Sequence, residues 1–234
     1  MTGIHVKKYN VAEHSKGVQN LIELYLIPTY LKRLKIKNED RHKYSHIEDV
    51  LDPDRILDPS FELSSFVTLT SDGEVIGCSL NYIVTRSEFQ QTWIEKNRVH
   101  ANDPTLPKSI RDYCQHISSS YDGLTSKVFD QYGNDRIIYV ESIIFKPEYR
   151  GNHTSHMQDQ AFEDEFFKNY HVFVDAMFPL EIFMKQAVTY TDYLAPVGRP
   201  IDEYTLLKRS LSYDKFVILS IFHSPPVALI KSKL

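Results

Sequence analysis

Apolar and polar residues alternate in several short runs along the chain, which is the period-2 pattern of half-buried β-strands. The strongest run covers residues 137–145, and Lys146-Pro147 closes it. Two further runs flank Asp72-Gly73, a dipeptide typical of a tight hairpin. Strands are expected at residues 4–8, 66–70, 75–84, 137–145, 172–178, 204–208, 216–222 and 227–230. The pattern therefore predicts a sheet as the framework of the molecule.

A helical period follows the first of these runs. The apolar positions that share one helical face are Val18, Leu21, Ile22 and Tyr25. Asn10 with Glu13 three residues later is a capping-box pattern, so the helix should begin there. Pro28 has no backbone N–H to donate, and we expect it to kink or end this helix.

Further helices are expected later in the chain. Residues 154–168 show helical spacing, and Pro179 suits the first turn of another helix. The side chains expected to face inward from 154–168 are Met157, Ala161, Phe162 and Phe166. Residues 35–60 are polar and predict a loop with one short helix at most. Residues 86–135 form a long polar insert, in which the apolar residues that indicate helices are Trp93, Ile94, Ile110 and Ile117.

The order of these elements favours the α/β (α+β) class. An antiparallel start followed by a βαβα unit predicts a mixed, mostly antiparallel twisted sheet with helices on both faces. A helical insert precedes its fourth strand. No Pro/Gly/Ser-rich stretch or block of charge supplies a linker, so residues 1–234 are expected to form a single domain. Ligands bind where such a sheet changes character.

Composition narrows the function classes. The 234 residues are 42% hydrophobic, and the formal charge is -4 with Lys and Arg scattered, which predicts no nucleic-acid surface. No run approaches the roughly 18 apolar residues of a membrane span, so no membrane partner is expected. Residues 1–10 lack the apolar segment of a secretory signal. Cys78 and Cys114 stand outside any CxxC pair and are expected to be reduced thiols of an intracellular protein.

The last three residues match a targeting address. Ser232, Lys233 and Leu234 spell the carboxy-terminal tripeptide that a peroxisomal import receptor reads. A peroxisomal location is therefore expected, with the cytoplasm as the alternative if the match is a coincidence. The strand expected at 227–230 leaves only a short tail for a receptor to hold.

The segment from Tyr139 to Ser155 carries the clearest chemistry. It reads as a strand, a turn of sequence Pro-Glu-Tyr-Arg-Gly, and the start of a helix. Backbone N–H groups at such a turn point outward, and the helix dipole adds partial positive charge. Arg150 adds a full charge beside them. This layout suits a pyrophosphate.

This block resembles the acetyl-CoA motif of the GNAT acyltransferase superfamily, and the pattern is most similar to invertebrate arylalkylamine N-acetyltransferases. The resemblance implies the GNAT fold, acetyl-CoA or another acyl-CoA as cosubstrate, and an amine as acceptor. It also implies that Ile143, Ile144 and Phe145 offer backbone groups to the pantetheine arm. The residues that it places around the pyrophosphate are Arg150, Gly151, Asn152, His153, Thr154, Ser155 and His156.

The sequence departs from that motif at several positions. Arg150 matches its first residue, but His153 and Ser155 stand where two glycines belong, and a Cβ there can narrow the site. Hydroxyl groups of Thr154 and Ser155, or the rings of His153 and His156, are expected to compensate as donors. Residues that stand where relatives carry catalytic groups are Ile27, Ala176, Pro179, Leu180 and Met184.

Two side chains remain as catalytic candidates. Glu141 lies on the strand at 137–145, where a half-buried carboxylate can take a proton from an ammonium group. Tyr190 or Tyr193 is a candidate proton donor to the leaving thiolate, on its place in the chain alone. An ion pair with Arg136 or a lysine is the structural alternative for Glu141. A metal site has the right helical spacing in His153, His156, Asp159 and Glu163, but we expect a solvated face there and no metal.

Two functions follow from this pattern. The first is acyl-CoA-dependent N-acyl transfer to a small primary amine, with arylalkylamines as one class of acceptor. The second is a catalytically impaired protein of the same fold that binds CoA, an amine or a protein partner. Acetylation of proteins is a third interpretation, which the insert at 86–135 disfavours because it can cover the acceptor side.

Overall fold

The computed structural model describes most of the chain. The described residues are 3–44, 52–122, 125, 129, 136–150, 153–166, 170, 172–179, 204–211 and 216–223. They divide into two compact units. One comprises Met1–Ile83 and Val140–Phe162, and the other comprises Val84–Tyr139 and Glu163–Leu234.

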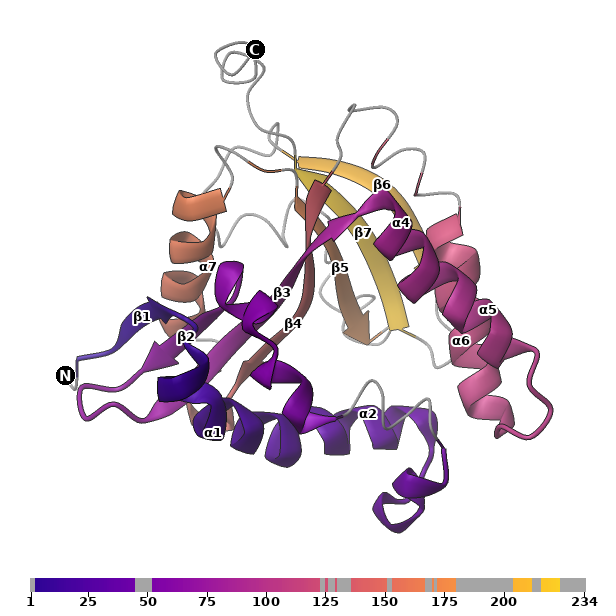
Figure 1. The fold of residues 1–234 in the computed structure, drawn as a ribbon, viewed down its shortest axis with the longest axis horizontal. Coiled ribbons are helices and arrows are strands. Elements are labelled where there is room, and N and C mark those ends of the chain that lie inside the picture. Colours follow the sequence, from indigo (N-terminus) through magenta and orange to yellow (C-terminus); the bar gives the residue numbers. More distant parts are fainter. Residues whose placement is uncertain are drawn as a thin grey trace. The chain divides into compact units, whose positions relative to one another are not determined.

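The first unit is built on an antiparallel sheet (Figure 1). Its strands are β1 (His5–Lys8), β2 (Phe66–Leu69), β3 (Val75–Thr85) and the end of β4 (Arg136–Phe145), in that order across the sheet. β2 and β3 form the hairpin predicted around Asp72-Gly73, and Gly73 has the positive φ of 86° that this turn requires. The backbone N–H of Lys146 donates to the carbonyl of Ile76, which continues the pairing of β3 beyond β4.

Helix α1 (Val11–Leu21) begins at Asn10 as predicted. The Asn10 side chain accepts a hydrogen bond from the N–H of Glu13 at 3.1 Å. In a capping box the Asn10 N–H would donate to the side chain of Glu13. Here it donates instead to Nδ1 of His14 at 3.0 Å. The ring of His14 is buried, so it fixes the start of the helix from inside the unit.

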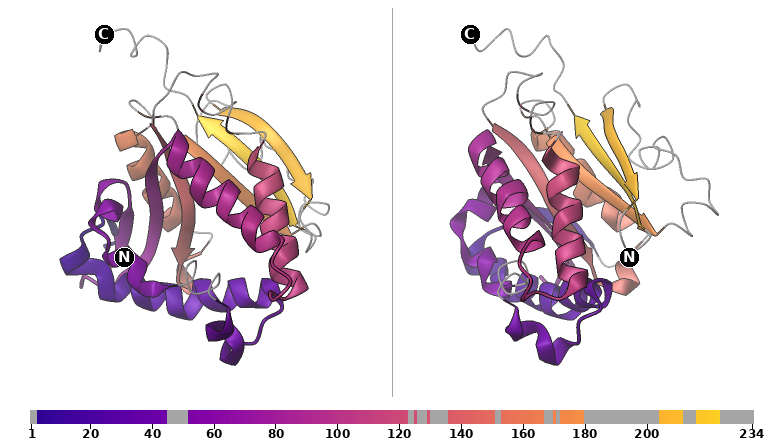
Figure 2. Two further views of the ribbon diagram at one scale, coloured as in Figure 1. Left: turned by 45° about the vertical axis from the view of Figure 1, so that its right-hand side comes forward. Right: turned by 90° about the vertical axis from the view of Figure 1, so that its right-hand side faces the viewer.

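Pro28 does not end the helix, which was one of the two expected outcomes. A π-helical turn, η1 (Ile22–Leu26), follows α1 and leads directly into α2 (Ile27–Leu34), as the views of Figure 2 show. A π-turn already leaves the ordinary hydrogen-bond pattern, so a proline directly behind it breaks fewer bonds than in a regular helix. The helix ends instead at Lys35, whose φ of 57° is left-handed.

Short 3-10 helices form the connection to β2, where the sequence predicted a loop with one short helix at most. They are η2 (Asn38–Lys43), η3 (Pro53–Leu57) and η4 (Pro59–Leu63). Asp52 caps η3 and Asp58 caps η4 through hydrogen bonds to backbone N–H groups two residues ahead. η3 and η4 therefore both start with an Asp-Pro pair.

Helices cover both faces of the sheet in the first unit, as predicted. The register of β2 against β3 shifts between Thr68 and Leu69. Thr68 donates to the side chain of Gln158 in α7 (His153–Phe166) at 2.8 Å. Val75, the partner of Leu69, lies against Gly17 of α1 so closely that a Cβ on the glycine would collide with it.

The buried face of α7 differs in part from the prediction. Phe162 and Phe166 are buried as expected, whereas Met157 and Ala161 are only partly buried. Thr154 and Gln158 are buried in their place. The inward positions therefore repeat every four residues, and two of them are polar, which an apolar period cannot detect.

The second unit contains the predicted helical insert. Its helices are α4 (Arg86–Phe89), the π-helical η5 (Gln90–Glu95), α5 (Lys96–Ala101) and α6 (Lys108–Asp122). The ring of Phe89 stacks on Trp93 and Tyr121, at centroid distances of 5.6 and 5.5 Å. The hydroxyl groups of Tyr121 and Tyr139 are 3.1 Å apart. Aromatic packing thus joins the insert to the first half of β4.

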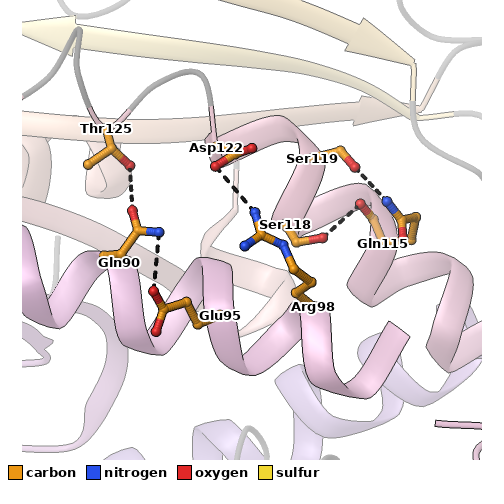
Figure 3. Close-up of polar contacts among 8 residues, drawn as sticks. All are labelled: Gln90, Glu95, Arg98, Gln115, Ser118, Ser119, Asp122 and Thr125. Carbon is orange, nitrogen blue, oxygen red and sulfur yellow. Dashed lines mark hydrogen bonds and ion pairs between the residues drawn. The ribbon is translucent and has the colours of Figure 1, made fainter. Parts of the chain in front are cut away.

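Polar contacts on the outside of the insert are drawn in Figure 3. Arg98 reaches from α5 to Asp122 at the end of α6, at 3.3 Å, and both side chains are largely exposed. Thr125 donates to the side chain of Gln90 at 3.4 Å. An exposed ion pair such as Arg98 with Asp122 contributes at most about 1 kcal/mol to stability.

The remaining strands of the second unit also follow the prediction. β5 (Val172–Pro179) pairs antiparallel with β7 (Phe216–His223), and β6 (Tyr204–Leu211) pairs antiparallel with β7. The strand expected at 227–230 and the helix expected after Pro179 lie outside the described residues, as does the tail Ser232–Leu234. None of the described helices is both long and apolar enough to span a bilayer.

Candidate active site

The predicted strand–turn–helix segment has the expected backbone. β4 ends at Phe145, a 3-10 turn η7 (Pro147–Tyr149) follows, and α7 begins at His153. Gly151 and Asn152, which join the turn to the helix, lie outside the described residues. The geometry therefore brings a strand end, a cationic side chain and the start of a 14-residue helix together along the chain.

Arg150 is held beside the strand end rather than extended into solvent. Its Nε donates to the carbonyl oxygen of Phe145 at 2.9 Å, and its guanidinium lies 5.7 Å from the ring centroid of Tyr25. Among the described residues it forms no ion pair with a carboxylate. Its charge is thus positioned by a backbone carbonyl and an aromatic face, and no carboxylate in the described part of the chain neutralises it.

The residues assigned to the pantetheine arm differ in exposure. Ile143 is 48% exposed, whereas Ile144 and Phe145 are buried. β4 is buried from Ile137 to Val140, and Glu141 to Ile143 are its more accessible positions before the strand end. The Phe145 carbonyl already accepts the hydrogen bond from Arg150, so its capacity for a ligand is reduced.

The residues assigned to the pyrophosphate are described only in part. His153, Ser155 and His156 lie in the first turn of α7, but their side chains lie outside what the structure describes. Thr154 is buried, so its side chain points into the unit. The helix start is consistent with an anion site, because the first N–H groups of α7 have no helical partner.

Glu141 lies on β4 and forms a buried ion pair with Arg55. Nη1 of Arg55 donates to Oε1 of Glu141 at 2.7 Å, and the two side chains are 13% and 17% exposed. The partner is neither Arg136 nor a lysine, the two alternatives that the sequence suggested. Arg55 lies 86 positions away in η3, and no local pattern in the sequence connects the two residues.

Burial determines the ionisation of this carboxyl group. Burial raises the pKa of Glu141 above its ordinary value, and the positive charge and hydrogen bond of Arg55 offset part of the rise. The second oxygen, Oε2, is buried and has no hydrogen-bond partner among the described residues. Glu141 therefore presents a basic oxygen with a raised pKa, which is what a proton acceptor near neutral pH requires.

Tyrosine and cysteine side chains surround the ion pair of Arg55 and Glu141. Burial, followed by the charge of Glu141, raises the pKa of Tyr82 on β3, and burial raises the pKa of Cys78 to about 12. Tyr30 of α2 also faces Arg55, and its charge interaction is part of what keeps the pKa of the guanidinium high. With these raised pKa values, Tyr82 and Cys78 keep their protons near neutral pH. The site is thus one carboxylate and one guanidinium in neutral surroundings.

Other predicted positions cannot be placed. Tyr190, Tyr193, Leu180 and Met184 lie outside the described residues. Ala176 and Pro179, which stand where relatives carry helix-start serines, lie instead within β5 and at its end. The tyrosine assigned as proton donor therefore stays a prediction.

Solved structures of N-acetyltransferases share this fold. A Drosophila melanogaster polyamine N-acetyltransferase that forms N-acetylagmatine aligns over 94% of this chain and 100% of its own, with a TM-score of 0.59 and 12% identity. The mosquito arylalkylamine N-acetyltransferase like 5b aligns over 94% of this chain and 99% of its own, with a TM-score of 0.59 and 14% identity. Arylalkylamine N-acetyltransferase 2 of Aedes aegypti aligns over 96% of this chain and 100% of its own, with a TM-score of 0.57 and 16% identity.

The chain therefore has the fold of the GNAT N-acetyltransferases, as the strand–turn–helix motif predicted. No protein-family model matches its sequence, and no curated protein does. At 12 to 16% identity these structures share a backbone arrangement with this chain, so function has to be argued from the site itself.

Proposed function

We propose that the protein is an N-acyltransferase that transfers the acetyl group of acetyl-CoA to a small primary amine. The observation that carries the proposal is Glu141, which presents a buried, unpaired carboxylate oxygen one short strand segment before a cationic turn. A proton acceptor and an anion-binding turn on the same strand are the two elements that amine acylation by a CoA thioester needs.

Acetyl-CoA would be held at the turn after β4. Arg150 supplies positive charge for the phosphates, the start of α7 supplies backbone N–H groups, and the open backbone near Ile143 supplies hydrogen bonds to the pantetheine arm. The bound thioester provides the activated acyl group. His153 and Ser155 stand at motif positions for glycine, so the phosphates would lie against side chains where other members have bare backbone.

Glu141 would act on the acceptor. An amine reaches the enzyme as an ammonium ion and must lose a proton before it can attack a carbonyl carbon. Oε2 accepts that proton, directly or through water, while Oε1 stays bound to Arg55. The new N–C bond forms as the C–S bond breaks, and the released thiolate takes up a proton.

The acceptor is proposed to be a small amine, with arylalkylamines and agmatine-like amines as the first classes to test. The support is the shared fold, because two neighbouring structures are arylalkylamine N-acetyltransferases and a third forms N-acetylagmatine. In the described residues the site contains a single carboxylate already paired with Arg55, which favours arylalkylamines over agmatine-like amines, because the latter carry a second positive charge.

The test measures thiol release from acetyl-CoA with tryptamine, phenylethylamine, agmatine and spermidine. The wild-type protein should turn over at least one of them, and Glu141→Gln should lower kcat/KM by about 10²- to 10⁴-fold. Glu39→Gln is the matched control, since its exposed carboxylate pairs with Lys37 on the surface. Absence of turnover with every amine would refute the proposal.

A second function is favoured by one observation. Ile27 stands where relatives carry an acidic residue, and its side chain is buried among apolar neighbours. Together with His153 and Ser155 at glycine positions, this supports a protein that binds CoA, an amine or a protein partner without catalysis. Tight CoA binding in calorimetry, combined with no turnover, would favour this alternative.

We also propose that the protein is imported into peroxisomes through Ser232, Lys233 and Leu234. The support is the sequence of the tripeptide and the supply of acyl-CoA in that organelle. A fluorescent protein fused to the N-terminus should give puncta that disperse when Leu234 is deleted. Diffuse fluorescence from both forms would contradict the proposal.

A further inference from the structure

Arg55 is presented to β4 by a short helix that is anchored at both ends. Asp52 caps η3, and Asp54, the second residue of the helix, accepts a hydrogen bond from Gln19 of α1 at 2.7 Å. The hydroxyl of Tyr9 donates to the carbonyl of Ile56 at 2.9 Å in the interior. These bonds fix the backbone on either side of Arg55, so its side chain starts from a defined position.

The contact itself is one-sided. Only Nη1 of Arg55 contacts Glu141, at Oε1, although a guanidinium can bind both oxygens of a carboxylate. Nε of Arg55 and Oε2 of Glu141 are buried and have no hydrogen-bond partner among the described residues. A purely structural pair would be expected to close this second bond, because unsatisfied buried groups are costly.

We propose that Arg55 is a positioning residue for acyl transfer, which holds Glu141 ionised by one oxygen and leaves Oε2 to take the proton of the amine. This inference rests on the proposed function of Glu141. It adds a second residue to the site, from a part of the chain that neither the motif nor the strand indicated.

The surroundings explain why one guanidinium has this effect. Burial disfavours the charged form of Glu141, and the groups that face the pair are Tyr82 and Cys78 from β3 and Tyr30 from α2. The raised pKa values of Tyr82 and Cys78 keep both side chains neutral near pH 7. Asp58 acts on Tyr82 and has no resolved influence on Glu141. Among the described residues, Arg55 is therefore the cation that keeps the carboxylate charged.

Two substitutions of Arg55 test its positive charge and its planar geometry separately. Arg55→Gln removes the charge, so the pKa of Glu141 should rise and the acidic limb of the kcat/KM profile should move to higher pH. At pH 7 we expect a loss of about tenfold or more, because each pH unit of displacement costs a factor of ten on that limb. Arg55→Lys keeps the charge and should keep the position of the limb, with a lower plateau from the lost planar geometry.

A second measurement does not depend on turnover. The side-chain carboxyl carbon of Glu141, labelled with ¹³C and assigned by its absence in Glu141→Gln, is titrated by NMR in the wild type and in both Arg55 variants. The midpoint should rise in Arg55→Gln and stay near the wild-type value in Arg55→Lys. Arg98→Gln is the matched control, because it breaks an exposed ion pair and should change neither midpoint nor profile.

The outcomes separate the two proposals. If no amine is acetylated, the proposed function fails, and an unchanged NMR midpoint in Arg55→Gln would overturn the role of Arg55 as well. If the wild type turns over but Arg55→Gln keeps the same acidic limb and midpoint, the role of Arg55 alone is overturned. A folded Arg55→Lys with wild-type pH dependence supports the inference even if Arg55→Gln does not fold.

Discussion

Gly77 of β3 has no side chain, and Phe145 packs closely against the strand at this position. A Cβ built on Gly77 would lie closer to the ring of Phe145 than real Cβ atoms lie to any neighbour. The carbonyl of Phe145 also receives the hydrogen bond from Arg150. A residue of the hairpin therefore helps to place the cationic side chain of the candidate CoA site, through one aromatic ring.

Gly77→Ala should consequently affect both stability and ligand binding. The new methyl group must displace Phe145, which should lower the free energy of unfolding by about 1–3 kcal/mol and weaken CoA binding. Urea unfolding and calorimetry with CoA measure the two effects. Gly3→Ala is the control, because a Cβ there meets only Ser71 at 4.0 Å. Equal stability of the two variants would contradict the packing argument.

At the scale of one helix, the start of α1 depends on an uncharged histidine. Burial lowers the pKa of His14 below its ordinary value of 6.5, with a smaller opposing effect from Glu13. Nδ1 can accept the hydrogen bond from the Asn10 N–H only while it carries no proton. Acid therefore removes a bond that fixes the first turn of the helix.

The sign of the resulting pH dependence follows from linkage. Because His14 binds a proton more readily in the unfolded chain, its contribution is complete above pH 6.5 and is lost as the pH falls through the lower pKa of the folded state. Urea unfolding at pH 7.5 and 5.5 should show a loss of about 1 kcal/mol in the wild type that is smaller in His14→Gln. His42→Gln, at an exposed position, should keep the wild-type difference.

At the scale of the molecule, CoA should stabilise the folded protein if the turn after β4 binds it. A ligand at about a hundredfold excess over its Kd adds roughly 2.7 kcal/mol to the free energy of unfolding. Thermal unfolding should therefore move to higher temperature with added CoA. The shift should shrink in Arg150→Ala and persist in Lys37→Ala, whose side chain is exposed. No shift in the wild type would exclude a CoA site.

Local patterns predicted the framework well. The hairpin around Asp72-Gly73 and the helix start at Asn10 depend on residues within a few positions, and both formed as expected. For Pro28 the sequence left open whether the helix kinks or ends, and the structure shows a π-turn before the proline with the helix continuing to Leu34. The 3-10 helices were missed because short polar turns carry no apolar period.

The candidate site was predictable only in part. Glu141 and Arg150 could be chosen because they lie on the strongest strand and directly after it. Arg55 and Tyr25 could not, because they reach the same region from segments that are distant in the chain. Distant pairings are fixed by the tertiary structure, and a single sequence contains no record of them.

The buried position of Ile27 limits which side chains can stand at this place in the helix. Its side chain is 1% exposed, inside a helix whose apolar face has been set by the π-turn ahead of it. A carboxylate introduced there would enter the hydrophobic core and would have to be neutralised or expelled. A single substitution of Ile27 by an acidic residue should therefore lower the stability of the fold.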